Sequence, residues 1–298
     1  MTAIPFERLM DQVDAGAPLP AEQLAALAAE HDVLSLGMLA DAARRRLHGK
    51  TVTYIRVAVC PSEASFADAV PPAAREIRIT GTPHSLDTAI AAVRSAKAVA
   101  GDRTVSGFSW SVVEQLASGA GLAVSRALAD LRSAGLEVLA ELPIDATENL
   151  DDAIEGLMRA GFDRLRLTVK TAGAEARTPL LLRAAALQDR WGSVGVINPL
   201  PMMLNALRPT TGFDDVRAVA VARLAAPTIP TVQVDWARYG PKLAQVALTF
   251  GADDLDGVTS SDEAPNGRRR APLEEVRRSI ESAGYEPAER DGRFRVAS

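Results

Sequence analysis

Lys170, Asp145 and His84 are the residues of this sequence best suited to acid–base or nucleophilic chemistry, because each stands just beyond a predicted β-strand. A lysine ammonium holds anions and, when desolvated, acts as a base or an amine nucleophile. Aspartate and histidine transfer protons. We therefore predict these three residues to be catalytic, with a solvated loop lysine and a capping or turn aspartate as the plainer alternatives for Lys170 and Asp145.

Five more side chains at comparable positions are predicted to bind a substrate. They are Glu114, Asn198, Asp235, Trp236 and Arg238. Trp236 can stack on a flat ligand or fill the mouth of the fold, and its indole N–H needs a partner in either position. The other two histidines, His31 and His48, lie at predicted helix ends and are expected at the surface.

A cluster of aspartates raises the separate possibility of a divalent cation and metal-dependent hydrolysis. The residues concerned are Asp145, Asp235, Asp253 and Asp254. Carboxylate oxygens suit such an ion, but the four side chains would have to converge on it. Because aspartate is equally favoured in helix caps and turns, we assign no metal ligand.

Composition excludes several classes of protein. The 298 residues carry a formal net charge of −5, so no overall field favours nucleic acid. No apolar run reaches the roughly 20 residues that span a bilayer. The first residues include acidic side chains and no long apolar stretch, unlike a signal peptide. We expect a cytoplasmic protein with no membrane span and no nucleic-acid partner.

Cys60 is the single cysteine of the sequence. A disulfide within the chain is therefore excluded. An iron–sulfur cluster normally takes three or four thiolates from its protein, and one cysteine cannot supply them. We accordingly predict no cluster and no other cofactor.

Strands and helices alternate along the sequence. The eight predicted strands are Thr51–Val59, Glu76–Thr80, Thr104–Phe108, Leu136–Ala140, Arg164–Val169, Val194–Ile197, Thr231–Asp235 and Leu255–Val258. Apolar helical patterns separate them, which indicates parallel βαβ units. Eight such units predict an α/β fold of the (β/α)8 barrel type. In such barrels ligands bind where the strands end, so the candidate residues above are expected to meet there.

We expect one domain of three parts: N-terminal helices over 1–50, the barrel over 51–259, and a loop, helix and tail over 260–298. The polar loop is Ser260–Pro272 and the last helix Leu273–Ala283. In the polar tail, Phe294 and Val296 are the side chains that could pack against the body.

The segment Thr231–Thr259, TVQVDWARYGPKLAQVALTFGADDLDGVT, carries a specific pattern of residues. Trp236 is followed by Gly240-Pro241-Lys242, and then by AQ, L, FGADD and LDG. We predict a loop from Trp236 to Gly240 and a helix that begins at Pro241. The pattern resembles the C-terminal part of the menaquinone radical-SAM enzymes, aminofutalosine synthase and dehypoxanthine futalosine cyclase. Leu36–Asp41 and Arg217–Trp236 are also similar to segments of that family.

The resemblance implies a radical-SAM-type barrel but not its cofactors. In the family, the loop after the first strand carries a CxxxCxxC motif; here that loop, Cys60–Pro72, lacks it. Cys60 is either a remaining ligand position or a small buried hydrophobic residue. Without a 4Fe-4S cluster no electron is available to cleave S-adenosylmethionine, and the replaced glycine-rich segments put binding of that cofactor in doubt.

Two hypotheses of function follow. In the first, the barrel is cluster-free and binds a menaquinone-pathway intermediate or a nucleoside-like carboxylate in a pocket lined by Lys170, Asp145, Asp235 and Arg238. In the second, it is a non-catalytic pseudoenzyme that scaffolds or regulates an active radical-SAM paralogue, as a homo- or hetero-oligomer. Its barrel mouth would then be filled by apolar side chains, namely Leu142, Pro143, Pro199, Met202 and Met203.

Overall fold

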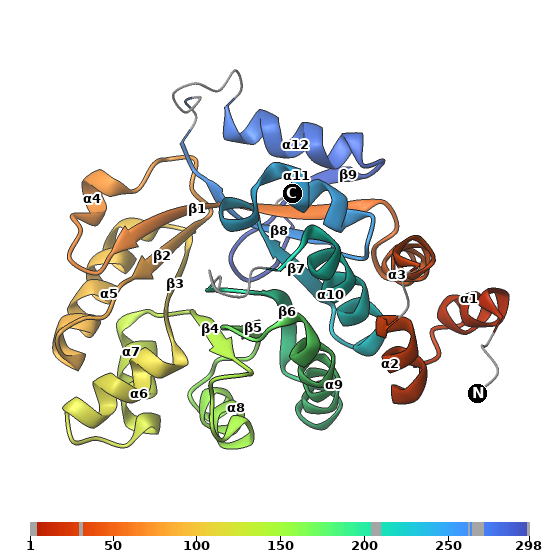
Figure 1. Ribbon diagram of the computed structural model, residues 1–298. Helices are drawn as coiled ribbons and strands as arrows, with labels where there is room; N and C mark the ends of the chain where they lie inside the picture. The colour runs from red at the N-terminus through yellow and green to blue at the C-terminus, as the bar shows by residue number, and fades with distance from the viewer. Residues whose placement is uncertain (1–4, 30–31, 204–209, 262, 264–270, 297–298) are drawn as a thin grey trace.

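A closed ring of parallel strands forms the centre of the molecule (Figure 1). The computed structural model describes residues 5–29, 32–203, 210–261, 263 and 271–296. The strands are β1 (Thr51–Pro61), β2 (Glu76–Thr80), β3 (Thr104–Ser109), β4 (Val138–Pro143), β5 (Leu165–Val169), β6 (Val194–Pro201), β7 (Thr231–Asp235), β8 (Asp254–Thr259) and β9 (Glu286–Glu289). Each of β1 to β8 pairs with its neighbours, and β1 closes the ring by pairing with both β2 and β8. The predicted (β/α)8-type barrel is thereby confirmed.

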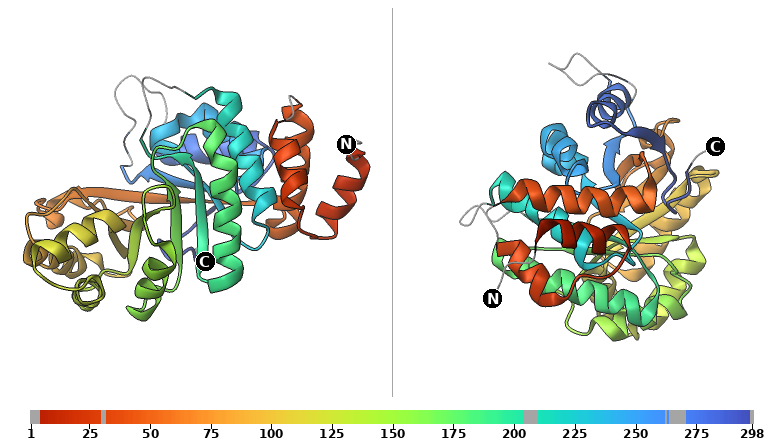
Figure 2. Two further views of the ribbon diagram at one scale, coloured as in Figure 1. Left: turned by 60° about the horizontal axis from the view of Figure 1, so that its bottom comes forward. Right: turned by 90° about the vertical axis from the view of Figure 1, so that its right-hand side faces the viewer.

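Helices surround the barrel on the outside (Figure 1). They are α1 (Phe6–Asp14), α2 (Ala21–Ala29), α3 (Val33–His48), α4 (Phe66–Ala69), α5 (Leu86–Ala100), α6 (Trp110–Gly119), α7 (Val124–Ala134), α8 (Leu150–Arg159), α9 (Ala174–Trp191), α10 (Gly212–Ala225), α11 (Trp236–Leu248) and α12 (Pro272–Ser282). The N-terminal helices α2 and α3 pack against α10, on one side of the barrel (Figure 2).

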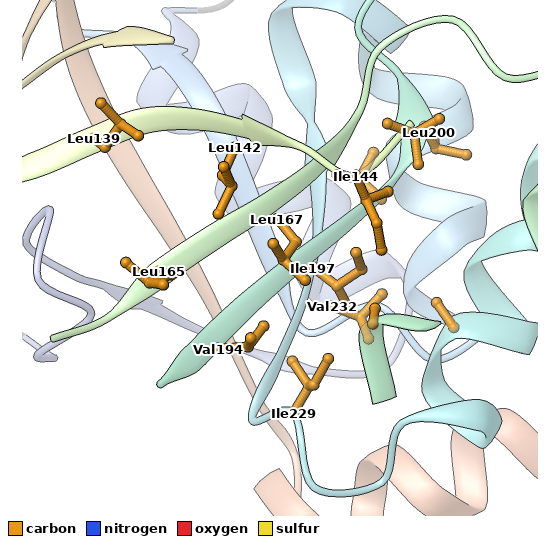
Figure 3. Packing of buried hydrophobic residues seen from close by; sticks show 14 of the residues in the cluster. Leu139, Leu142, Ile144, Leu165, Leu167, Val194, Ile197, Leu200, Ile229 and Val232 are labelled. Atoms are coloured by element: carbon orange, nitrogen blue, oxygen red, sulfur yellow. The ribbon is translucent and has the colours of Figure 1, made fainter. Parts of the chain in front are cut away.

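Apolar side chains on the outer face of the strands make the main core. On β4 to β7, Leu139, Leu167, Ile197 and Val232 point away from the lumen into a shared cluster (Figure 3). Every residue of β5 is buried, as expected of a strand covered on both faces. At roughly 25 cal/mol per Å² of buried apolar surface, this layer supplies most of the favourable free energy of folding.

Two local features differ from the predictions. Residues 236–239 form a short helical turn where a loop was predicted, because the Asp235 side chain accepts a hydrogen bond from the backbone N–H of Arg238 and caps that turn. Gly240, with φ 74° and ψ 166°, interrupts α11, and the helix that follows begins at Pro241 as predicted. The tail also contains a ninth strand that was not predicted, β9, which pairs in parallel with Thr51–Tyr54 of β1. Its sequence, Glu-Pro-Ala-Glu, has no β-propensity, so only the tertiary context reveals it.

The lumen of the barrel is polar and charged. Asp256 on β8 accepts two hydrogen bonds of 2.9 Å from Arg78 on β2 and one of 3.3 Å from Arg166 on β5. These strands are not neighbours in the ring, so their side chains can meet only through its interior. Burial alone would raise the pKa of the Asp256 carboxyl, but Arg78 and Arg166 outweigh that effect and hold this pKa below its ordinary value.

The C-terminal tail completes this network from the N-terminal end of the barrel. Arg290, which is fully buried, donates to both carboxylate oxygens of Asp254 at 2.5 and 2.7 Å. Phe294 lies against the Arg290 guanidinium, with 3.8 Å between the guanidinium carbon and the ring centroid. Three arginines, Arg78, Arg166 and Arg290, then face three carboxylates, Asp254, Asp256 and Glu76. The tail therefore supplies one of the three charges that neutralise the lumen.

Replacing Arg290 by alanine leaves Asp254 buried without its charged partner. We expect the free energy of unfolding to fall by about 3–5 kcal/mol, measured by urea denaturation. Arg295→Ala is the matched control, because its pair with Asp291 is exposed and is expected to contribute less than about 1 kcal/mol. Equal stabilities of the two variants would contradict a structural role for Arg290.

Candidate functional site

Four of the predicted site residues meet at the C-terminal ends of β5, β6 and β7, around Met202. Arg238 donates to the Met202 sulfur at 2.8 Å, and the Asn198 side-chain amide lies 4.0 Å from the same sulfur. The backbone N–H of Met203 donates to the carbonyl of Lys170 at 2.8 Å. Asp235 lies 3.5 Å from Arg238. Asn198, Asp235 and Arg238 thus lie together around Met202, and Lys170 adjoins them through its backbone; we call these four residues the mouth cluster.

Asp235 is the member of the mouth cluster best suited to proton transfer. Burial, and then the nearby charge of Asp256, raise the pKa of the Asp235 carboxyl. The two aspartates are register partners on β7 and β8. A carboxyl whose pKa is moved toward neutral pH is a better general acid or base than an ordinary one.

Asp145 holds the loop that carries Lys170. Its carboxylate accepts three backbone hydrogen bonds, from the N–H groups of Lys170 at 2.6 Å, Thr171 at 2.8 Å and Ala172 at 3.0 Å. Both oxygens of Asp145 are therefore engaged by the backbone of this loop. The Lys170 ammonium makes no hydrogen bond or ion pair to any side chain among the residues with described positions.

Arg238 and Trp236 differ in what they can offer a ligand. A thioether is a weak hydrogen-bond acceptor, so the Arg238 guanidinium, about one-third exposed, has donors left for a stronger acceptor. Trp236 is buried, with only 6% of its surface exposed. It packs within the apolar core, so of the two uses considered for it, filling space fits better than stacking on a ligand.

His84 and Glu114 do not join the mouth cluster. His84 is exposed in the loop after β2, and Glu114 is exposed on α6 after β3. Of the other histidines, His31 lies outside the described residues, and the ring of His48 lies 2.8 Å from the carbonyl of Pro230.

The four aspartates do not converge on a common point. Asp253 pairs with Arg223 and Asp254 with Arg290, while Asp145 and Asp235 are engaged as described above. Within the described part of the chain, no group of three or more His, Cys, Asp and Glu side chains is arranged to hold a metal ion. The geometry therefore gives no support to metal-dependent hydrolysis.

Cys60 does not fit a cluster site. It lies near the end of β1, fully buried in the apolar layer between strands and helices, and burial raises the pKa of its thiol. Thr53, on the opposite face of β1, bonds to Asp254 in the lumen, so strand alternation turns Cys60 away from the mouth. A single outward thiol cannot provide the three ligands that a 4Fe-4S cluster needs.

Apolar residues close part of the mouth. Of the apolar residues predicted to fill it, Leu142, Pro143 and Pro199 are buried, and Leu142 pairs in register with Leu167 of the outer apolar layer, whereas Met202 is half-buried and Met203 is 57% exposed. Met202 and Gly257 are the two residues with a role in the site that were not predicted as site residues. Gly257 forms a bulge in β8, with φ 71°, directly beside Asp235. A glycine within a predicted strand is a signal for such a bulge.

Comparison with solved structures identifies the fold class of this protein. At TM-scores of 0.68 and 0.67, the fold matches methylornithine synthase (PylB), over 94% of this chain and 97% of that chain, and the hydrogenase maturase HydG, over 95% and 75%. Sequence identities are 16% and 14%, so these likenesses show a shared fold. Among the described residues, no helix has the length and apolar character that crossing a membrane requires.

Comparison of sequences identifies the relatives of this chain more closely than the fold does. Residues 200–298 match the family model described as the CofH/MqnC C-terminal region. The chain is 28% identical to the 5-amino-6-(D-ribitylamino)uracil–L-tyrosine 4-hydroxyphenyl transferase of Archaeoglobus fulgidus, over 87% of this chain and 92% of that protein. It is 33% identical to the aminodeoxyfutalosine synthase of Thermus thermophilus, over 41% of this chain and 36% of that protein. The chain is a radical-SAM-like barrel protein related to the enzymes of the futalosine pathway, as its sequence resemblance predicted.

Replacing Asp235 by asparagine tests the electrostatics of the mouth cluster. Asparagine retains the helix cap but does not titrate. Because the pKa of Asp235 is raised in the folded state, the stability due to its protonated form is present below the unfolded pKa and is lost as pH rises through the folded pKa. We therefore expect the wild type to lose stability relative to Asp235→Asn as pH rises above the ordinary titration range of aspartate. Urea unfolding at several pH values measures the difference, and a change of the opposite sign would disprove the assignment.

Replacing Gly257 by alanine tests the bulge that supports Asp235. A Cβ atom at Gly257 would lie 3.2 Å from the Asp235 carboxylate, in a backbone conformation that disfavours any side chain. We expect a loss of about 1–2 kcal/mol in stability, measured by thermal or urea unfolding. Gly212→Ala is the control, since that position has open space and no positive φ, and it should cost nothing. Similar losses in both variants would argue against the bulge.

Proposed function

We propose that this protein is a cluster-free radical-SAM-like barrel that binds a small carboxylate-bearing molecule at the C-terminal end of the barrel. The class of ligand that we favour is a menaquinone-pathway intermediate or a nucleoside-like carboxylate, because the relatives include aminodeoxyfutalosine synthase. The observation that carries the proposal is the charge pattern of the mouth cluster. Among the residues that the structure describes, Lys170 has no carboxylate partner and Arg238 has Asp235 at 3.5 Å, and both residues lie at the end of the barrel where ligands bind in this fold.

Each residue of the mouth cluster would have a different role in binding this ligand. A ligand carboxylate would pair with the Lys170 ammonium and the free donors of Arg238, whose planar fork suits a bidentate contact. The Asn198 amide would fix the ligand's orientation. Asp235, with its raised pKa, would give a proton to the bound molecule or take one from it. Asp145 would act indirectly, by holding the backbone of the Lys170 loop.

The main alternative is a non-catalytic pseudoenzyme that scaffolds or regulates a radical-SAM paralogue. Two exposed apolar side chains on α3, Leu34 (75% exposed) and Met38 (57% exposed), stand one helical turn apart and support a contact surface. The partly apolar mouth supports it as well. In that case the mouth cluster would bind nothing, and the protein would be recovered with a protein partner.

Native mass spectrometry of protein purified from its own cells separates the two proposals. We expect a bound small molecule in the wild type, and its loss in the Lys170→Gln/Arg238→Gln double variant, because two charged contacts are removed. Arg183→Gln is the control: it removes one positive charge from an exposed position on α9, as each of the two substitutions does at the mouth cluster. This variant should retain the ligand.

Two results would contradict the first proposal. A protein partner in stoichiometric amount, with no small molecule, would favour the scaffold. Stoichiometric iron and sulfide with visible cluster absorbance in the isolated monomer would show that the protein is not cluster-free.

A further inference from the structure

A cavity lies at the opposite end of the barrel from the mouth cluster. It has a volume of about 450 Å³ and is bordered by the starts of β4, β5 and β6 and by the C-terminal tail. We call it the basal cavity. The charged side chains that line it are the arginines Arg132, Arg164, Arg293 and Arg295 and the carboxylates Glu137 and Asp163. Four cations against two anions give its walls a positive balance.

Most of these charges are already engaged within the protein. Glu137 pairs with Lys97 at 2.6 Å and also with Arg293. Arg295 pairs with Asp291 at 2.7 Å, and Arg132 donates to the carbonyl of Leu136 at 3.0 Å. These groups shape the cavity, and they leave Arg164 as the cation with capacity for another partner.

Arg164 is held in the wall without an acceptor. Its side chain crosses Gly195 so closely that a Cβ atom there would clash with it, and its guanidinium faces the Phe294 ring at 4.8 Å. Within the described part of the chain it makes no ion pair, and its buried Nε has no hydrogen-bond partner. Burial, and then repulsion by Arg290, lower the pKa of Arg164. A desolvated guanidinium with unused donors is stabilised when an anion binds to it.

Ser193 gives independent evidence for a missing partner. The residue lines the same cavity and is only 5% exposed, and its buried hydroxyl oxygen has no hydrogen-bond partner among the described residues. Buried hydroxyl groups are normally hydrogen-bonded. The Ser193 hydroxyl and the Arg164 guanidinium are both hydrogen-bond donors without an acceptor, and an oxyanion would accept hydrogen bonds from both.

We propose that the basal cavity binds an oxyanion, the phosphate or carboxylate group of a small molecule, through Arg164 and Ser193. The Phe294 ring offers an apolar surface for the rest of that molecule. The C-terminal end of α9 lies at the same cavity, and its dipole opposes an anion. A bare ion is therefore expected to bind weakly. This site is separate from the mouth cluster and does not depend on the function proposed for it.

Isothermal titration calorimetry with inorganic phosphate, at constant ionic strength, tests the proposal. We expect saturable binding to the full-length protein with a Kd of roughly 1 mM or tighter. Arg164→Gln should weaken it at least about tenfold, and Ser193→Ala about threefold to tenfold. The control Arg183→Gln removes a positive charge from the exposed face of α9 and should bind as the wild type does.

A parallel titration with acetate distinguishes the source of the oxyanion. Tighter binding of acetate with the same dependence on Arg164 would indicate a carboxylate ligand, and tighter binding of phosphate a phosphorylated one. Ser193→Ala removes a hydroxyl that has no hydrogen-bond partner, so this variant is expected to fold. It therefore tests the proposal even if Arg164→Gln does not fold. Absence of saturation with both ions, or equal affinity in the wild type and the variants, would overturn the proposal.

Discussion

The ion network inside the barrel is the constraint on which the rest of the structure depends. Asp256 is buried between Arg78 and Arg166, and Asp254 is buried against Arg290. A buried charge costs several kcal/mol unless it is paired with good geometry. Without Arg290, two arginines would face three carboxylates. This explains why a short tail with no strand-forming sequence is nevertheless held in place, by β9 along β1 and by Phe294 beneath Arg290.

The same network sets the properties of the mouth. Burial, and then the charge of its register partner Asp256, raise the pKa of the Asp235 carboxyl, while the arginines of the network keep the pKa of Asp256 low. The bulge at Gly257 gives Asp235 the space it occupies. The positive charge that a carboxylate ligand would meet at the mouth comes from Lys170 and Arg238.

The strands and site residues that could be predicted are those marked by a local sequence pattern. Hydrophobic periodicity placed all eight barrel strands, with β2 and β7 at the bounds the structure gives. It missed β9, whose pairing is with a strand more than 200 residues earlier. Strand ends located Lys170, Asn198 and Asp235, because topology alone brings such ends together. Selection by strand ends also included His84 and Glu114, which are exposed and lie outside the mouth cluster. Their position after a strand does not determine where the side chain points. Asp145 was selected as an acid and is instead bound by three backbone N–H groups.

The fold is shared with methylornithine synthase and HydG, and Cys60, the single thiol, is buried in the apolar layer between strands and helices. The central claim is that fixed charges in the lumen now order the barrel and its mouth. Carbon NMR titration of the aspartate side-chain carboxyls tests it most directly. The account predicts that Asp256 stays ionised at every pH at which the protein is folded, while Asp235 becomes protonated above the ordinary range for aspartate. A titration in which Asp256 takes up a proton before Asp235 would contradict it.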